Sequence, residues 1–505
     1  MLSEKQIESA FEKIRQRIDK VNGEYLKKVG EQIKTIGRLN PQSVNRIEQM
    51  RIYGAQSRKI KKELEKALGL SAKEVSALLK MAAEEEYASA DLPAVQTGKK
   101  PLPLFQNHSL MTYIEAVSAQ TEETFINYSK TTNIDENYRE TVSDAIDAVS
   151  RGVVDYNSAI RSSMRKLGGD GLRVTYESGH TRRLDTAIRM NILDGVKQIA
   201  GEAQRQIGEQ IGADGVELSA HPYSAADHEA AQGRQYTLEE YEKMQSGSSF
   251  SDTDGNRYEG FRRPVMQWNC RHFPSYILIG ISPRRYSDEQ LKKWRESNRK
   301  GCEIDGKSYT IYEASQLMRR LETKIRQQKD IANLAKISGD SVLRRHAQTK
   351  IREIRAKYNE TAEKAGLRVR NDKMIVESYA ETKAEAEIAD KGALSIQKAR
   401  DAIRNGEYPL NINPEKQKRH MEGTNTKGRS VITVSMEELQ EIVNRTAGSG
   451  VMSSNAKGEW DKKEIIHAGT VLGYTINEEN VIIYTERGKI HYSKTGVHVV
   501  PYSGR

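Results

Sequence analysis

Apolar residues in the first 95 positions recur at intervals of three and four along the chain. The first stripe of this kind consists of Phe11, Ile14, Ile18, Val21, Tyr25 and Val29. This spacing is typical of one face of an amphipathic helix. Further along, Ser71 precedes an apolar run and Glu74 follows three positions later, as in the capping box that begins many helices. Residues 1–95 are therefore predicted to form an N-terminal helical region whose role is packing.

Three further segments follow from the pattern up to residue 410. The stretch TGKKPLPLFQN, residues 97–107, is rich in Gly and Pro and predicts a domain boundary. Helical spacing then gives way to a mixed region and returns over 312–365, where a break at 338–340 predicts a helical hairpin. Residues 96–370 are predicted to be one α+β domain with this hairpin, and residues 371–410 a helical linker.

The pattern changes again beyond residue 410. Short β-branched runs, SVITV, TVLGYTI, NVIIYT, KIHYSK and VHVVP, are separated by the turn signals NEEN, ERG and TG. Such runs are typical of short strands in a sheet. Residues 411–505 are predicted to form a separate, small α+β domain, which makes the whole chain a multidomain protein with a mainly α-helical N-terminal region.

Length and charge narrow the class of protein only slightly. The chain has 505 residues and a formal net charge of +10 at pH 7, with Lys and Arg spread over its whole length. This surplus permits contact with phosphate backbones without establishing it. The first residues lack the apolar segment of a secretory signal, and no run approaches the roughly 18 apolar residues of a membrane span. The two cysteines, Cys270 and Cys302, cannot build a disulfide framework, which indicates synthesis in a reducing cytoplasm.

The middle region contains a group of polar residues that could form a site. It comprises His221, Asp227, His228, Gln232, Gly233, Cys270 and His272. Three interpretations are open. A tetrahedral zinc site would use Cys270 and His272 with His221 or His228. Alternatively, Cys270 could act as a nucleophile with His228 and Asp227, or the group could be a buried, hydrogen-bonded core.

A second polar group lies on the last two predicted strands. If residues 495–496 form a two-residue hairpin turn, Ser493 faces His498 and His491 faces Val500. Because side chains alternate along a strand, His491, Ser493 and His498 then share one face of the sheet. This face is either a solvated surface or a chemical site, and a slip of one residue in register would scatter the three side chains.

The segment before these strands is strongly basic and contains a further histidine. Its candidate groups are Lys416, Lys418, Arg419, His420, Thr424, Arg429 and Ser430. A ribonuclease that uses no metal needs a base for the 2′-hydroxyl proton, an acid for the leaving oxygen and cations for the phosphorane charge. These residue types meet that need if they converge, and the alternative is a solvated charged surface.

Four motifs occur in order in the first 370 residues. They are SGHTRRLDTAIRMNI at 178–192, SAHPYSAADHEAAQGRQY at 219–236, WNCRHFPSYILIGISPRRYSDEQLKKW at 268–294 and YEASQLMRRLETKIRQQK at 312–329. Together they resemble the phage minor capsid protein 2 family, which is related to head-morphogenesis proteins similar to Mu protein F. The resemblance implies a low-copy virion protein inside the capsid near the portal. Its partners would be portal and capsid proteins and packaged DNA, in head assembly or in DNA ejection.

The C-terminal domain resembles the type 50 polymorphic toxin domain. The resemblance rests on K-Q-x-[KR]-H-x-x-G-T-N, then G-[KR]-S, then A-G-[ST]-G near 447–450, then I-H-Y-S-K-x-G-x-H-[IV]-V-P. It implies a barnase- or EndoU-like α+β fold and a ribonuclease that needs no cofactor. By position, the catalytic residues would be His420, Ser430, His491, Ser493, Lys494 and His498, and the substrate-binding residues Lys418, Arg419, Thr424 and Arg429.

The two resemblances together imply a phage head protein that carries a toxin. It would be made in the bacterial cytoplasm, held at the portal by its first 370 residues, and neutralised by an immunity protein, while its C-terminal domain cleaves RNA after delivery. His420 or His498 would be the base and the other the acid. The rival hypothesis is a purely structural head protein whose C-terminal domain binds the portal, DNA or another head protein. A third hypothesis makes the central Cys/His group a zinc enzyme.

Overall fold

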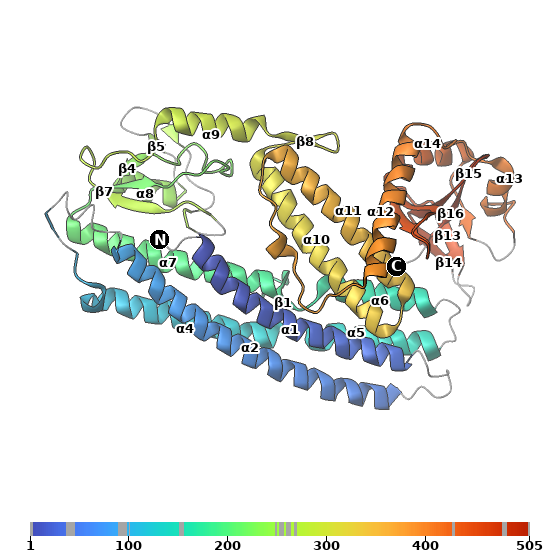
Figure 1. Ribbon diagram of the computed structural model, residues 1–505, viewed down its shortest axis with the longest axis horizontal. Helices are drawn as coiled ribbons and strands as arrows, with labels where there is room; N and C mark the ends of the chain where they lie inside the picture. Colours follow the sequence, from blue (N-terminus) through green and yellow to red (C-terminus); the bar gives the residue numbers. More distant parts are fainter. Residues whose placement is uncertain are drawn as a thin grey trace.

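The computed structural model is elongated, with long helices along one side of the molecule. Figure 1 shows a small sheet with a covering helix at one end of the opposite side, the C-terminal sheets at the other end, and a helical hairpin between them. The structure describes residues 4–36, 46–88, 98–99, 101–150, 156–247, 250–251, 257–258, 264–266, 270–426, 430–476 and 482–502.

The long side is built from helices that share one hydrophobic core. They are α1 (Glu4–Ile36), α2 (Arg46–Ala88), η1 (Leu104–Gln106), α4 (His108–Thr131), α5 (Ile134–Ser150), α6 (Tyr156–Asp170) and α7 (Leu184–Ile211), and the strands β1 (Arg173–Thr175) and β2 (Thr181–Arg183) pair just before α7. The predicted stripe from Phe11 to Val29 is buried in this core. The prediction of packed N-terminal helices is therefore confirmed.

The capping box predicted at Ser71 is wrong. α2 runs through this position without a break, and the Ser71 hydroxyl donates to the carbonyl oxygen of Ala67, one turn earlier, at 2.8 Å. A serine inside a helix can make this bond. Leu68 and Val75, on either side, are buried in the same core. Packing along one continuous face thus keeps the helix intact where the local sequence favours a new start.

A three-stranded antiparallel sheet packs against α7. Its strand order is β4-β3-β7, with β3 (Gly215–Leu218) between β4 (Gln235–Thr237) and β7 (Pro274–Ile277). α7 can approach β7 closely because Gly208 has no side chain, and a Cβ there would lie 2.6 Å from the Cβ of Tyr276. Around the sheet lie α8 (Leu238–Gln245), α9 (Asp288–Lys300) and the paired strands β5 (Phe250–Ser251) with β6 (Arg257–Tyr258). The paired strands β8 (Cys302–Ile304) and β9 (Lys307–Tyr309) pack against the helical hairpin.

The predicted helical hairpin is confirmed. It consists of α10 (Ile311–Ser338) and α11 (Ser341–Ala365). Thr310 begins α10 with a capping box, and the carboxylate of Asp340 caps the first turn of α11. Between the helices Gly339 has φ +86°, a left-handed conformation that costs glycine little. The break at 338–340 therefore acts through its glycine and its capping aspartate.

The C-terminal part contains two antiparallel sheets, so its predicted α+β character is confirmed. The four-stranded sheet has the order β11-β12-β15-β16 and the three-stranded sheet the order β10-β13-β14. The elements are η2 (Asn371–Met374), α12 (Lys383–Arg404), α13 (Pro414–Gln417), η3 (Lys418–His420), β10 (Val431–Ile432), α14 (Met436–Thr446), β11 (Val451–Ser454), β12 (Trp460–His467), β13 (Gly473–Ile476), β14 (Ile482–Thr485), β15 (Arg487–Ser493) and β16 (Gly496–Pro501). The turn predicted at 477–480 lies outside the described residues.

α12 occupies most of the segment that was predicted to be a helical linker. Its side chains Ile396, Ala399 and Ile403 are buried in the same hydrophobic cluster as Trp460 and Tyr492 of the C-terminal sheet. Figure 1 shows α12 between the hairpin and this sheet. The helix is therefore part of the C-terminal core as well as the connection to it.

Candidate functional site

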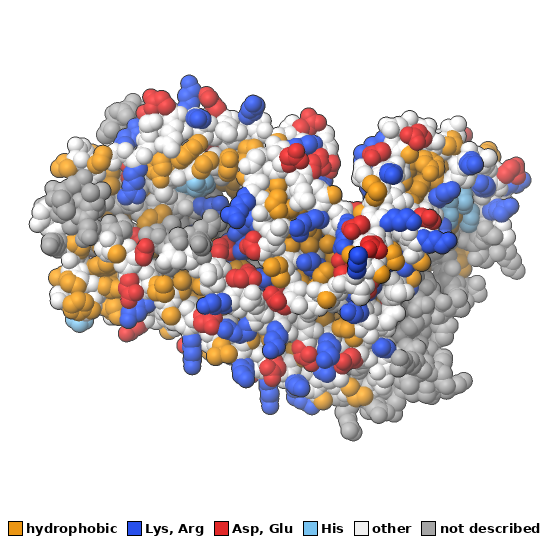
Figure 2. Space-filling model, viewed as in Figure 1, with side chains coloured by type: hydrophobic (Ala, Val, Ile, Leu, Met, Phe, Trp, Pro, Cys, Tyr) orange, Lys and Arg blue, Asp and Glu red, His pale blue; other side chains and the backbone are white. Residues whose placement is uncertain are grey.

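Three histidines from separate segments of the C-terminal domain lie side by side. The ring centroids of His491 and His498 are 4.6 Å apart with an interplanar angle of 24°, and those of His420 and His498 are 6.2 Å apart with an angle of 14°. His498 is therefore the middle ring of a stack. Figure 2 shows pale-blue histidines at the surface of this domain with blue Lys and Arg side chains around them.

The hairpin of β15 and β16 has a different register from the predicted one. Its turn is formed by residues 494–495, so His491 pairs directly with His498. Gly496 belongs to the strand because the segment before α13 passes it, and a Cβ there would lie 2.3 Å from the carbonyl oxygen of Asn411. This contact with a distant segment overrides the Thr-Gly turn signal, and the predicted turn is wrong.

The predicted sharing of a face is nevertheless confirmed. The partner of each residue moves by two positions, and an even shift leaves every side chain on its original face. Tyr492 and Val497 point into the hydrophobic core. The opposite face of the same two strands carries the half-buried side chains of His491, Ser493 and His498.

Gln417 fixes His420 beside this face. The Gln417 side chain is fully buried, donates from Nε2 to the carbonyl oxygen of Val499 at 3.0 Å and accepts from the Val499 backbone N–H at 2.7 Å. It therefore acts as an extra strand partner for the outer edge of β16. Because Gln417 ends α13 and η3 follows it directly, His420 is held against His498.

The orientation of the His420 ring follows from one hydrogen bond. Its Nδ1 lies 3.1 Å from the carbonyl oxygen of Ser430. A carbonyl oxygen can only accept, so Nδ1 carries the proton in this pair, and Nε2 is the nitrogen that can take up or release a second one. Ser430 therefore contacts this site through its backbone carbonyl.

Burial and neighbouring positive groups make two of the rings poor proton acceptors from bulk water. Burial, followed by His498 and Lys463, lowers the pKa of His491 to about 4. Burial, followed by His420, Lys416 and Arg419, lowers the pKa of His498 to about 4. Both imidazoles are therefore neutral at pH 7, the form in which an imidazole can act as a base.

Lys416 supplies a cation next to the histidines. Its ammonium donates to the Ser493 hydroxyl at 3.0 Å, and this hydroxyl donates to the carbonyl oxygen of Gly496 at 2.7 Å. Lys463 lies directly opposite His491 on the neighbouring strand β12. Lys416 was one of the candidate groups of the basic segment, whereas Lys463 was not among the predicted site residues. Lys416 belongs to the basic run around His420, whereas only the strand register identifies Lys463.

The other predicted residues lie at or outside the rim of this site. Lys418 and Arg419 are exposed next to His420, and Lys494 is exposed in the hairpin turn. The Thr424 hydroxyl donates to the carbonyl oxygen of Lys418 at 2.9 Å, which stabilises the loop after η3. Arg429 lies outside the described residues.

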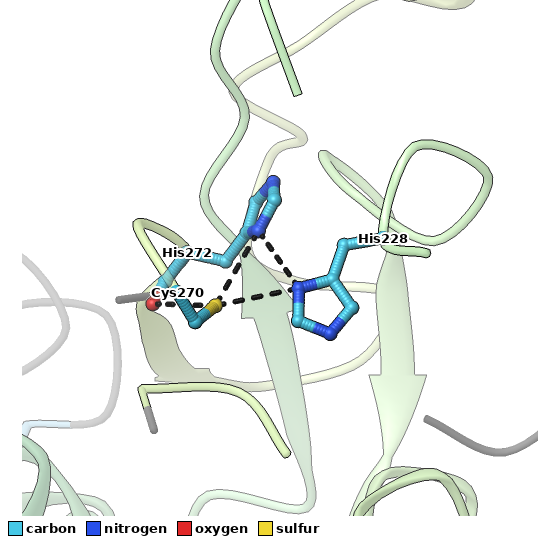
Figure 3. A group of neighbouring side chains, drawn as sticks. All are labelled: His228, Cys270 and His272. Carbon is cyan, nitrogen blue, oxygen red and sulfur yellow. Dashed lines mark hydrogen bonds between the residues drawn. The ribbon is translucent and has the colours of Figure 1, made fainter. Parts of the chain in front are cut away.

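A second group of side chains, in the central part, has the spacing of metal ligands. The Nδ1 atoms of His228 and His272 lie 3.3 Å apart, and they lie 3.3 Å and 3.6 Å from the Sγ of Cys270. All three side chains are buried, and Figure 3 shows their ligand atoms converging. In a tetrahedral zinc site, ligand atoms lie roughly 3.3 Å apart for two nitrogens and roughly 3.6 Å apart for nitrogen and sulfur. The three residues can therefore hold a metal ion such as zinc.

Neighbouring groups orient these side chains as a metal site requires. His272 Nε2 lies 3.0 Å from the amide oxygen of Gln232, so Nε2 carries the proton and Nδ1 keeps a lone pair for a ligand bond. The Lys197 ammonium donates to the backbone carbonyl of Cys270. Asp227 lies 3.8 Å from His228 Nε2. These contacts hold the imidazoles in the tautomer that presents Nδ1 to the centre.

His221 lies beside the three ligand atoms instead of among them. Its ring stacks on His272 with centroids 4.6 Å apart. Among the described residues, no group forms a hydrogen bond with its buried Nε2. Burial, followed by Arg271 and His228, lowers the pKa of His221 to about 4. Trp268 and Asn269, which begin the motif that ends in Cys270 and His272, lie outside the described residues.

Comparison with known families matches both halves of the chain. The family model described as phage minor capsid protein 2 matches residues 2–362, and the one described as bacterial toxin 50 matches residues 412–501. No curated protein and no solved structure matches the chain. In the part of the chain that the structure describes, none of the helices has the length and apolar character that a membrane crossing needs. The fusion of a phage structural region with a toxin domain is thereby confirmed.

Proposed function

Because this chain belongs to the phage minor capsid protein 2 family and ends in a bacterial toxin 50 domain, we propose that it is a virion protein whose C-terminal domain cleaves RNA. The observation that carries the RNA-cleaving part is the stack of His420, His498 and His491 with Lys416 next to it. Two imidazoles and a cation within reach of one another are the groups that RNA cleavage without a metal requires.

In the proposed reaction His498 is the base. Its neutral imidazole takes the proton of the ribose 2′-hydroxyl, and the 2′-oxygen attacks the adjacent phosphorus. The bond from phosphorus to the 5′-oxygen breaks, and the products are a 2′,3′-cyclic phosphate and a 5′-hydroxyl. Lys416 would lie near the phosphate and stabilise the negative charge of the phosphorane.

His420 is the proposed acid that protonates the 5′-oxygen. Its Nδ1–H is bound to the Ser430 carbonyl oxygen, and this hydrogen bond persists when the ring takes a second proton, because both nitrogens of an imidazolium donate. The hydrogen bond thus leaves Nε2 of His420 as the nitrogen that can carry the transferred proton, whereas the surroundings of His498 favour its neutral form. This difference supports the assignment of acid to His420 and base to His498.

The test is cleavage of transfer RNA and total RNA by the full-length chain in the presence of EDTA. Wild type is expected to cleave, and His498→Ala and His420→Ala are each expected to lower the rate by at least about 100-fold, as for loss of a general acid or base. The matched control is His467→Ala, because His467 is an exposed histidine of the same domain whose partner is Glu486 at 3.3 Å. Intact RNA with wild type, or equal rates for all three variants, contradicts the proposal.

Expression in a bacterium separates this proposal from a purely structural C-terminal domain. A toxin should arrest growth when no immunity protein is present, and His498→Ala should relieve the arrest. A binding module for the portal, DNA or another head protein should leave growth unchanged in both cases. Harmless expression of wild type would therefore favour the structural alternative.

The family membership of residues 2–362 supports a place inside the phage head. We propose that this region attaches the protein to the portal and neighbouring capsid proteins, beside packaged DNA, and carries the toxin domain into the cell at ejection. Labelling of the protein in purified particles tests this location. Signal restricted to one vertex is expected, whereas signal over the whole shell or absence from particles contradicts it.

We also propose that His228, Cys270 and His272 bind one zinc ion, because the spacings between their ligand atoms match the edges of a zinc tetrahedron. Bound there, zinc would cross-link the loop after β3 to the segment before β7 and so stabilise the central sheet. This is a structural role, in which Cys270 serves as a ligand. Elemental analysis of the purified chain tests the assignment.

A further inference from the structure

A cavity of about 580 Å³ opens between α7, α10 and the loop that carries His221. It adjoins a smaller cavity of about 140 Å³ that reaches α1, and both are lined by Arg189, Arg319 and Arg370. Figure 2 shows pale-blue and blue side chains meeting in the hollow between the central sheet and the hairpin. The larger cavity is within the roughly 300–1,000 Å³ range of small-molecule sites.

Arginine side chains are the main charged groups that line this cavity. The lining contains Arg189, Arg271, Arg319, Arg368 and Arg370, with Glu322 as its one acidic side chain among the residues that the structure describes. The Glu322 carboxylate accepts from the Tyr358 hydroxyl at 3.0 Å. Outside the lining, Glu8 is shared by Arg189 at 2.5 Å, Arg370 at 3.6 Å and Lys373. The five arginines of the lining therefore outnumber the carboxylates of Glu322 and Glu8, which leaves the cavity positively charged.

Arg319 is the centre of this charge. Among the described residues, no group forms a hydrogen bond or ion pair with its guanidinium. Burial, followed by the guanidinium groups of Arg271 and Arg189, lowers its pKa to about 10. Guanidinium groups crowded at a partly buried site repel one another, and an anion with several acceptor oxygens relieves this repulsion while it pairs with their N–H groups.

Flat rings also line the cavity. His221, Tyr223 and Tyr312 line the cavity, and the His221 ring is held in place by its stack on His272. The buried Nε2 of His221 has no hydrogen-bond partner among the described residues. Flat side chains of this kind stack on the faces of nucleobases. A ligand with phosphate at one end and a planar ring at the other would meet both kinds of side chain.

We propose that this cavity binds a nucleotide, with its phosphates on Arg189, Arg319 and Arg370 and its base against His221 and Tyr223. The phosphate could belong to a free nucleotide or to an end of nucleic acid, because the recognised chemistry is the same. The site is separate from the histidine stack of the C-terminal domain, so it adds a binding function to the phage structural region.

Calorimetric titration of the full-length chain with ADP, pyrophosphate and a 20-base-pair DNA duplex tests the proposal. ADP is expected to bind, pyrophosphate to compete with it, and Arg319→Met to weaken ADP binding at least tenfold. The matched control is Arg320→Met, which removes an exposed cation at the next position of the same helix and should bind as wild type does. Arg368→Met, at the exposed rim, should weaken binding without disturbing the fold, and a thermal melt checks each variant.

Three results would overturn the proposal. The first is absence of ADP binding to wild type. The second is an equal loss for Arg319→Met and Arg320→Met, which indicates only the general charge of the surface. The third is DNA binding that ADP does not displace and that Arg319→Met does not change, which places the nucleic acid elsewhere on the chain.

Discussion

His491 on β15 lies directly opposite His498 on β16, and the two imidazole rings stack with centroids 4.6 Å apart. On the opposite face of the same two strands, Tyr492 and Val497 are buried in the hydrophobic core. One hairpin therefore stabilises the domain with one face and presents its titratable groups on the other.

This pair makes the stability of the C-terminal domain depend on pH. The folded-state pKa of both rings is about 4, below the ordinary value of 6.5. Between these values the unfolded chain binds more protons than the folded one, so the stability that the neutral rings contribute is complete above pH 6.5 and is lost as pH falls toward 4. Thermal melting between pH 7.5 and 4 should show a smaller fall in Tm for His491→Asn than for wild type. His467→Asn is the control, and an identical fall in all three proteins contradicts the expectation.

Gln417 is expected to affect RNA cleavage because it holds His420 in place, without itself contacting the RNA. Gln417→Ala removes both hydrogen bonds to the Val499 backbone and is expected to lower the free energy of unfolding by about 2 kcal/mol. RNA cleavage should fall further than the unfolded fraction explains, because His420 loses its support. Denaturant unfolding together with the cleavage rate measures both effects. Gln397→Ala, an exposed glutamine on α12, should change neither. Wild-type cleavage by Gln417→Ala would show that the segment holds His420 by other contacts.

The zinc proposal predicts a difference between the two cysteines. Elemental analysis should find about one zinc ion per wild-type or Cys302→Ser chain and little in Cys270→Ser. Cys302 is the matched control because it lies on β8, outside the ligand group. Chelation should also lower the Tm of wild type but not of Cys270→Ser. Equal zinc in both variants would exclude Cys270 as a ligand.

Two neighbouring glycines of α6 should respond in opposite ways to alanine. A Cβ at Gly168 would lie 2.9 Å from the backbone nitrogen of Ile331 on α10, whereas a Cβ at Gly169 would meet nothing within 4 Å. Gly168→Ala is expected to destabilise the fold by about 1–3 kcal/mol through overpacking. Gly169→Ala should stabilise it by up to about 1 kcal/mol, because alanine favours the helix. Denaturant unfolding measures the two values, and equal effects would mean that α6 and α10 do not cross closely here.

Much of the fold could be predicted from local signals. The stripe from Phe11 to Val29 and the glycine and aspartate between α10 and α11 act within a few residues, so pattern and capping rules find them. The same rules placed a helix start at Ser71, where burial of Leu68 and Val75 decides for one long helix instead. The local preference for a helix start at Ser71 is weaker than the packing of one continuous helix face.

The sequence by itself determined which residues could do chemistry. The alternation along the last two strands was enough to put His491, Ser493 and His498 on one face, because that face depends only on even spacing. The motif around Cys270 likewise contains Cys270 and His272, two of the three proposed metal ligands. Only the tertiary structure decided what these residues meet. Contact of Gly496 with Asn411 set the turn at 494–495, and Gln417 on Val499 brought His420 to His498. The arginines of α7 and α10 line one cavity because the two helices lie on either side of it. Contacts of this kind join segments that are distant in the sequence, so no local pattern contains them.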